Sequence, residues 1–119
     1  MLRVLIADDE ARICQLIQAL GDWERLGLEV AGAAHNGQEA LEKTEALRPD
    51  ILITDIRMPG LNGLELIRRV KTLFPKLEVM IISGYAQFDY AQQALRNGVG
   101  EYLLKPINRE ALNRTLEKM

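Results

Sequence analysis

Short apolar runs alternate along the chain with segments in which apolar residues recur every three or four positions. The runs are Leu2–Ala7, Leu28–Ala33, Ile51–Asp55, Val79–Ser83 and Glu101–Leu104. Three of them are continuous aliphatic or β-branched stretches, which is typical of strands buried on both faces of a sheet. We therefore predict a strand at each of these five places.

The segments between the runs have the spacing of amphipathic helices. The apolar positions are Ile13, Leu16, Ile17 and Leu20; Ala40, Leu41, Thr44 and Leu47; Leu64, Ile67, Val70 and Phe74; and Leu112, Leu116 and Met119. A weaker pattern, made of Phe88, Ala91, Ala94 and Leu95, predicts one more helix that ends at Asn97-Gly98. Asn36, Asn62 and Asn108 are the predicted N-caps, and the first two stand three residues before a glutamate, as in a capping box.

The alternation of strands and helices predicts an α/β fold. Right-handed crossovers place helices on both faces of a parallel sheet. We expect a flavodoxin-like, doubly wound (βα)5 domain with five parallel strands in the order 2-1-3-4-5. The 119 residues suffice for one domain, over positions 1–119, that buries a core without disulfides.

Composition and charge exclude several classes of protein. The formal net charge is −2, so no overall basic field attracts nucleic acid or an anionic membrane. The sequence has no apolar stretch long enough for a bilayer and no signal peptide, because the first apolar run stops at two aspartates. The single cysteine, Cys14, falls on the apolar side of a predicted helix, so we expect a buried structural thiol in a reducing cytoplasm.

Residues suited to phosphate chemistry stand at the carboxyl ends of four of the predicted strands. They are Asp8 and Asp9, Asp55, Ser83 and Lys105. Because the carboxyl ends of parallel strands meet at one edge, where open α/β sheets bind ligands, we expect these side chains to converge. Three carboxylates favour Mg²⁺, with Mn²⁺ as an alternative ion. Pro106 restricts the backbone of Lys105 to extended geometry, with a cis and a trans bond both open.

Each of these residues can have an ordinary structural role or a role in phosphate chemistry. Asp55 can act as a nucleophile that takes up a phosphoryl group, with Lys105 as a compact positive charge and Ser83 as a nearby hydroxyl. Taken singly, the Asp8-Asp9 pair is an N-cap with its neighbour, Asp55 a turn former, Lys105 a solvated surface lysine and Ser83 a loop residue. Their common position at one edge of the sheet favours the chemical interpretation.

With these motifs, the chain resembles the receiver domain of bacterial two-component response regulators over essentially its whole length. The matching segments are Asp8-Asp9-Glu10, Thr54-Asp55-Ile56-Arg57-Met58-Pro59, Asn62-Gly63, Ser83-Gly84 and Tyr102-Leu103-Leu104-Lys105-Pro106. The resemblance implies a phosphoacceptor at Asp55, an acidic metal pair at Asp8 and Asp9, and a phosphoryl-contacting lysine at Lys105. It also implies that the Arg57 backbone carbonyl binds the metal.

The resemblance further implies a switch. Ser83 matches the family's switch hydroxyl and Tyr102 its switch aromatic, and phosphorylation would reshape the surface of the fourth helix, fifth strand and fifth helix. For Tyr102, the alternative is a half-exposed strand tyrosine without a switching role. Arg57 and Tyr85 are expected to flank the mouth of the site. Such a domain is not a turnover enzyme, although it promotes its own phosphorylation and dephosphorylation.

Several partners are implied in the same way. The phosphodonor would be a sensor histidine kinase, and phosphorylation would promote homodimerisation. The chain also resembles the subgroup with an AraC-type helix-turn-helix output. The segments that carry this resemblance are Ile56-Arg57-Met58-Pro59, Ser83-Gly84-Tyr85, Phe88-Asp89-Tyr90-Ala91 and the insertion of Asp22-Trp23 followed by Leu26-Gly27. In the full-length protein that C-terminal output domain would bind DNA and regulate transcription, whereas the present chain would bind neither nucleic acid nor membrane.

Other functions fit the sequence less well. A phosphohydrolase of the haloacid dehalogenase type carries its nucleophile on the first strand, whereas Asp55 follows the third. A flavin carrier requires a phosphate loop where this chain has Asp8-Asp9-Glu10, which repels phosphate. A pseudo-receiver that works without phosphorylation remains the alternative, and the intact acidic set argues against it. His35, with no second histidine or cysteine nearby in the sequence, is not expected to bind a metal.

Overall fold

The computed structural model describes residues 1–84 and 98–119, so the helix predicted around Phe88 and the predicted site residue Tyr85 lie outside the described residues. The elements in chain order are β1 (Leu2–Ala7), α1 (Ala11–Leu20), β2 (Leu28–Ala34), α2 (Gly37–Leu47), β3 (Ile51–Thr54), α3 (Gly63–Leu73), β4 (Glu78–Ser83), β5 (Glu101–Leu104) and α5 (Arg109–Glu117). All five predicted strands are present, with bounds that differ by at most one residue.

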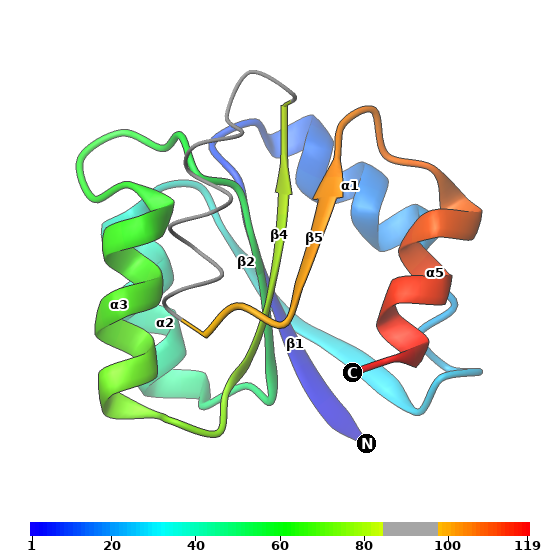
Figure 1. Cartoon of the computed structure of the whole chain (residues 1–119), viewed down its shortest axis with the longest axis horizontal. Helices are drawn as coiled ribbons and strands as arrows, with labels where there is room; N and C mark the ends of the chain where they lie inside the picture. The colour runs from blue at the N-terminus through cyan, green and yellow to red at the C-terminus, as the bar shows by residue number, and fades with distance from the viewer. Residues whose placement is uncertain (85–97) are drawn as a thin grey trace.

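The strands form one parallel sheet in the order β2-β1-β3-β4-β5, which confirms the predicted topology. Helices α2 and α3 cover one face of the sheet, and α1 and α5 cover the other (Figure 1). None of the described helices has the length and apolar content needed to span a membrane.

The central strands are buried on both faces, as their continuous apolar runs predicted. In β1, Val4 and Ile6 face the core beneath α1 and α5, whereas Leu5 and Ala7 face the core beneath α2 and α3. This alternation follows from the two-residue repeat of a strand. Burial of both strand faces fixes the register, because a slip by one residue would exchange the two cores.

The three predicted asparagine caps are confirmed. The side chains of Asn36, Asn62 and Asn108 accept hydrogen bonds from the backbone N–H groups of Glu39, Glu65 and Ala111, at 2.7, 3.0 and 3.0 Å. Helix α1 begins differently, because its N-cap residue Glu10 makes no side-chain capping bond. The aspartates that precede it are therefore not committed to capping this helix.

A buried amide joins α5 to the end of α1. Asn113 donates to the carbonyls of Leu20 and Arg109, at 3.0 and 2.9 Å, and accepts from the N–H of Asp22 at 2.7 Å. Trp23 donates its indole N–H to the carbonyl of Gln18 in α1. The first connection of the chain is thus tied to both helices on this face.

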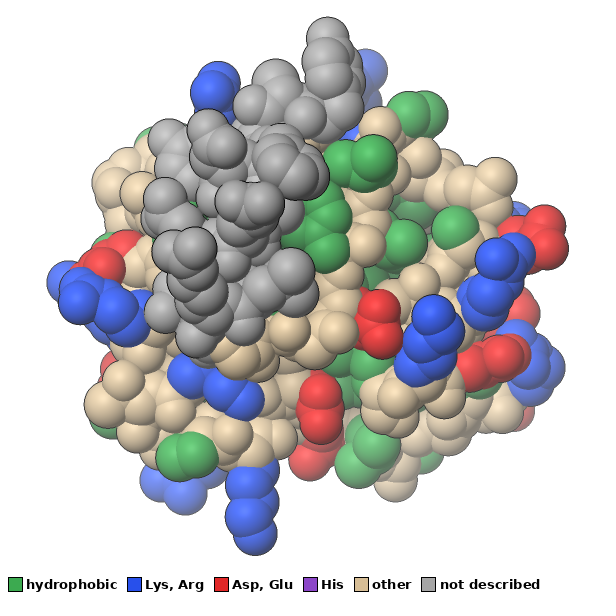
Figure 2. All heavy atoms as spheres, in the orientation of Figure 1, with side chains coloured by type: hydrophobic (Ala, Val, Ile, Leu, Met, Phe, Trp, Pro, Cys, Tyr) green, Lys and Arg blue, Asp and Glu red, His purple; other side chains and the backbone are tan. Residues whose placement is uncertain are grey.

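The surface outside this junction is charged with both signs. Figure 2 shows acidic and basic side chains interspersed on the side formed by α5. Arg25 pairs with Glu117 at 3.2 Å and Arg114 pairs with Glu110 at 2.9 Å. Exposed pairs of this kind add little to stability, so the buried amide is the stronger tie between α1 and α5.

We predict that Asn113→Ala lowers the free energy of unfolding by about 1–3 kcal/mol, because buried backbone groups at the end of α1 lose their partners. Urea denaturation measures this change. The matched control is Arg114→Ala, which removes an exposed ion pair on the same helix and should cost about 0.5 kcal/mol or less. Equal losses in the two variants would contradict the assigned role of the amide.

Candidate functional site

The parallel sheet brings the predicted site residues to one edge. β1, β3, β4 and β5 are neighbours in the sheet, and Asp8, Asp55 and Lys105 directly follow three of them, while Ser83 ends the fourth. The strand order therefore brings these residues together at one edge of the sheet. This location at the carboxyl ends of the strands is where open α/β sheets bind their ligands.

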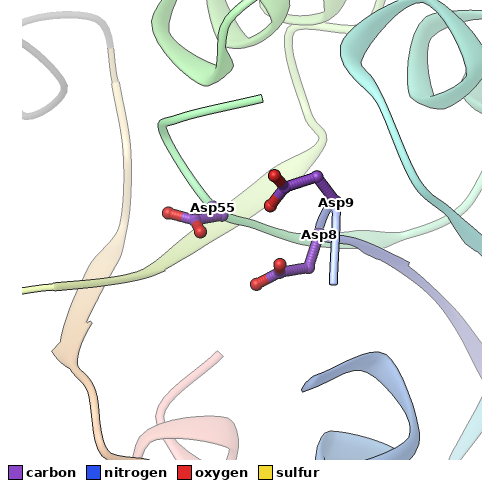
Figure 3. Close-up of side chains that lie close together, drawn as sticks. All are labelled: Asp8, Asp9 and Asp55. Atoms are coloured by element: carbon purple, nitrogen blue, oxygen red, sulfur yellow. The ribbon is translucent and has the colours of Figure 1, made fainter. Parts of the chain in front are cut away.

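Three carboxylates form the centre of the site. Oxygen atoms of Asp8, Asp9 and Asp55 all lie within 4.8 Å of one another, at the ends of β1 and β3 (Figure 3). Asp8 and Asp55 are buried, with 2% and 7% of their surface exposed, whereas Asp9 is exposed. A compact set of hard oxygen ligands that is open on one side fits Mg²⁺ with some of its water ligands retained.

Lys105 neutralises part of this charge. Its Nζ lies 2.8 Å from Oδ2 of Asp55 and 3.0 Å from Oδ2 of Asp8. Burial opposes the charge on this ammonium, but the hydrogen bonds to the two carboxylates outweigh burial and raise the pKa of Lys105. The lysine is thus a positive charge shared by both buried aspartates. The Lys105–Pro106 peptide bond is cis.

Asp8 is the carboxylate that burial perturbs most clearly. Burial raises the pKa of Asp8 from 3.8 to about 6, although hydrogen bonds from the N–H of Glu10 and from Lys105 act in the opposite direction. The negative charge of Asp55 adds to the rise. Removal from water therefore outweighs pairing with Lys105 at this position.

The carboxylate of Asp55 is oriented from two sides. Its Oδ1 accepts from the N–H of Ile56 at 2.6 Å, and its Oδ2 accepts from Lys105. The hydroxyl of Thr54 donates to the Asp55 carbonyl at 2.8 Å. Hydrogen bonds therefore fix both the backbone of Asp55 and its carboxylate.

The remaining predicted residues surround this centre. Ser83 is fully buried at the end of β4, and its carbonyl accepts from the N–H of Lys105 at 2.8 Å. Tyr102 lies partly buried in β5, and its buried hydroxyl has no hydrogen-bond partner among the residues the structure describes. Arg57 is exposed and, with Asp9, Met58, Pro59 and Asn62, lines a hollow of about 350 Å³ beside the acidic group.

Two residues next to Asp8 were missed from the sequence as parts of the site. The carbonyl of Asp8 lies 3.3 Å from Nδ1 of His35 and 3.7 Å from the Cys14 thiol, which donates to it. Burial raises the pKa of Cys14 to about 11, so this thiol stays protonated and unreactive, as expected of a structural cysteine. No motif joins residues 14 and 35 to the aspartates, so sequence spacing carried no signal of this contact.

Comparison with known proteins agrees with this geometry. The model of the response regulator receiver domain family matches residues 4–117. The chain therefore belongs to the receiver domain family of two-component response regulators.

Three similar proteins illustrate the kinship. The transcriptional regulatory protein YesN of Bacillus subtilis, described as uncharacterized, is 42% identical over 119 residues, which are 100% of this chain and 32% of that protein. The receiver domain of the response regulator AraT from Geobacillus stearothermophilus superposes with a TM-score of 0.95 at 40% identity, over 98% of this chain and 91% of that chain. A two-component transcriptional regulator AraC from Clostridium phytofermentans gives 0.91 at 30% identity, over 99% and 92%.

Membership of the family has defined consequences. Receiver domains are signalling modules rather than turnover enzymes, they bind Mg²⁺ at an acidic pocket, and they work with histidine kinases and with output domains. The chain spans about a third of the length of YesN. The activity of any longer protein is therefore a matter for proposal.

We predict that the metal-free protein loses stability, relative to an Asp8→Asn variant, as the pH rises from about 4 to about 6. The pKa of Asp8 is higher in the folded than in the unfolded chain, so the folded state binds more protons across this window. The stabilising proton is present at about pH 4 and is lost as the pH passes 6, with a total effect of up to roughly 3 kcal/mol.

Urea denaturation of both proteins at a series of pH values, in the presence of a chelator, measures this difference. An Asp9→Asn variant is the control, because Asp9 is exposed beside Asp8. Parallel pH profiles for the wild type and Asp8→Asn would contradict the prediction.

Proposed function

We propose that this chain is a phosphoacceptor receiver domain in which Asp55 takes up a phosphoryl group and thereby switches an output. The observation that supports this most strongly is the shared ion pair: Lys105 contacts Asp55 and Asp8 together, within a group of three converging carboxylates. A lysine that serves only solubility extends into solvent, whereas this lysine bridges two buried carboxylates.

In the proposed reaction, a carboxylate oxygen of Asp55 attacks the phosphorus of a phosphohistidine on a sensor kinase. The new P–O bond forms as the P–N bond breaks, and the released imidazole keeps the electron pair and takes up a proton. Bound Mg²⁺, or Mn²⁺ in its place, supplies positive charge for the phosphoryl oxygens. Asp8, Asp9, Asp55 and the Arg57 carbonyl would hold the ion, while Lys105 faces the phosphoryl group from the side of β5.

The switch in this proposal uses Ser83 and Tyr102. The hydroxyl of Ser83 donates to the phosphoryl group, and Tyr102 turns as the end of β4 rearranges. Support comes from the buried Tyr102 hydroxyl, which has no hydrogen-bond partner within the described part of the chain. A rotation of the ring therefore breaks no hydrogen bond with these residues. Arg57, which lines the hollow beside the acidic group, controls the access of water to the acyl phosphate, and we propose the same role for Tyr85, which lies outside the described residues.

The proposal includes partners beyond the chain. The signal passes to a C-terminal output domain of the AraC type, which binds DNA and regulates transcription, through the surface of β5, α5 and the helix predicted around Phe88. Phosphorylation favours a homodimer through this surface. The two neighbours described above as transcriptional regulators support this assignment. A cytoplasmic location suits such a role. A phosphorylation-independent interaction module is the alternative.

Intact-mass spectrometry after incubation with acetyl phosphate and Mg²⁺ tests the function. We expect one phosphoryl adduct on the wild type and none on Asp55→Asn or in the presence of a chelator, because the transfer needs both the nucleophile and the metal. A Thr72→Ala variant, altered at an exposed position on α3 away from the site, is the control and should be phosphorylated like the wild type. No adduct on a folded, Mg²⁺-binding wild type would favour the pseudo-receiver.

A further inference from the structure

The loop of residues 55–62, which connects β3 to α3, comes into close backbone contact with helix α2 at a glycine. Gly37 is the first residue of α2 and is buried. A Cβ atom placed on Gly37 would lie 1.7 Å from the carbonyl oxygen of Leu61 and 2.7 Å from its Cβ. No real side chain fits at such a distance, so the approach of α2 to this loop requires a residue without a Cβ.

A second glycine closes the same loop on the other side. A Cβ on Gly63 would lie 2.2 Å from the carbonyl oxygen of Asp55 and 2.7 Å from Cα of Ile56. The N–H of Gly63 donates to the carbonyl of Ile56 at 2.6 Å. The start of α3 is therefore pressed against the backbone of Asp55 itself.

Side chains of the loop anchor it between these two contacts. Ile56, Met58 and Leu61 pack into the core that also contains Ala40 and Leu41 of α2. Arg57, by contrast, is exposed between two buried neighbours. The loop thus rests on the core side of α2 and cannot shift relative to that helix without opening the contact at Gly37.

We propose that Gly37 is a positioning residue for the metal site, although it belongs to a helix that supplies no ligand. By allowing α2 to lie directly against the Leu61 carbonyl, it sets the position of the loop that carries Asp55 and the Arg57 carbonyl. This inference rests on the proposed function, in which both groups hold Mg²⁺.

The choice of metal distinguishes positioning from general stability. Mg²⁺ requires near-octahedral geometry at about 2.0–2.1 Å, whereas Ca²⁺ accepts irregular sets of oxygens at about 2.3–2.6 Å. In Gly37→Ala, the Leu61 carbonyl must retreat by on the order of 1 Å, a displacement large enough to disrupt a preorganised site. We expect the dissociation constant for Mg²⁺ to rise by about 10–100-fold, as when the supporting residues of a metal site are changed, and that for Ca²⁺ to rise much less.

Isothermal titration calorimetry of the 119-residue chain with Mg²⁺ and with Ca²⁺ measures the two dissociation constants. Circular dichroism and urea denaturation show whether each variant is folded. Gly32→Ala is the matched control. It makes the same substitution in β2, where a Cβ would approach only the ends of the Leu47 and Leu5 side chains, at 3.3 and 3.7 Å. This control should bind both metals like the wild type.

A selective loss of Mg²⁺ affinity in folded Gly37→Ala supports the inference, whereas unchanged or equally weakened binding of the two metals overturns it. If Gly37→Ala does not fold, the same two titrations are made on Leu61→Ala, which weakens the packing of the loop against α2 without a steric clash. A selective loss of Mg²⁺ affinity in this variant supports the inference, and unchanged or equally weakened binding of the two metals overturns it. A wild type that forms the Asp55 adduct, together with a variant that binds Mg²⁺ normally, refutes only the inference. A wild type that binds no Mg²⁺ refutes the proposed function, and the inference with it.

Discussion

The shared ion pair between Lys105 and the two buried aspartates is the interaction on which the site depends. Two carboxylates held close together in a poorly hydrated pocket repel each other, and removal from water raises the pKa of Asp8 to about 6. One ammonium, 2.8 Å from Asp55 and 3.0 Å from Asp8, offsets part of this cost. The cluster still holds three carboxylates against one lysine, and this imbalance is what makes it a site for a second cation.

The sheet supplies the structure that holds this cluster together. Because β1, β3, β4 and β5 are adjacent and parallel, residues far apart in the chain emerge side by side at one edge. The cores on both faces fix the register of β1 and β3, and with it the height at which Asp8 and Asp55 emerge. Backbone groups then set the finer orientation, as when the N–H of Ile56 binds Oδ1 of Asp55.

Much of this arrangement was predictable from the sequence, for physical reasons. Strand order, asparagine caps and the meeting of Asp55 with Lys105 follow from periodicity and from the geometry of parallel sheets. Side-chain contacts between different helices and loops were not predictable, because they depend on how these elements pack in three dimensions. The hydrogen bond between Asn113 and the N–H of Asp22, for example, joins residues 91 positions apart in the sequence. Gly37 carried no signal either, since a glycine after an N-cap has many ordinary explanations, and only the position of Leu61 shows what it permits.

The charge balance of the site also connects the chemistry to β5. In the proposed function, a phosphoryl group on Asp55 replaces about one negative charge with about 1.5–2 and adds strong acceptor oxygens. Lys105 already donates to two carboxylates, so it can serve the new oxygens by turning its third N–H toward them or by exchanging its contact with Asp55. Its backbone N–H is bonded to the carbonyl of Ser83, and Tyr102 lies three residues earlier in the chain, on β5. In the proposed function, a movement of Lys105 toward the new oxygens would therefore reach the ends of β4 and β5, where the buried hydroxyl of Tyr102 has no hydrogen bond within the described residues to hold it in place.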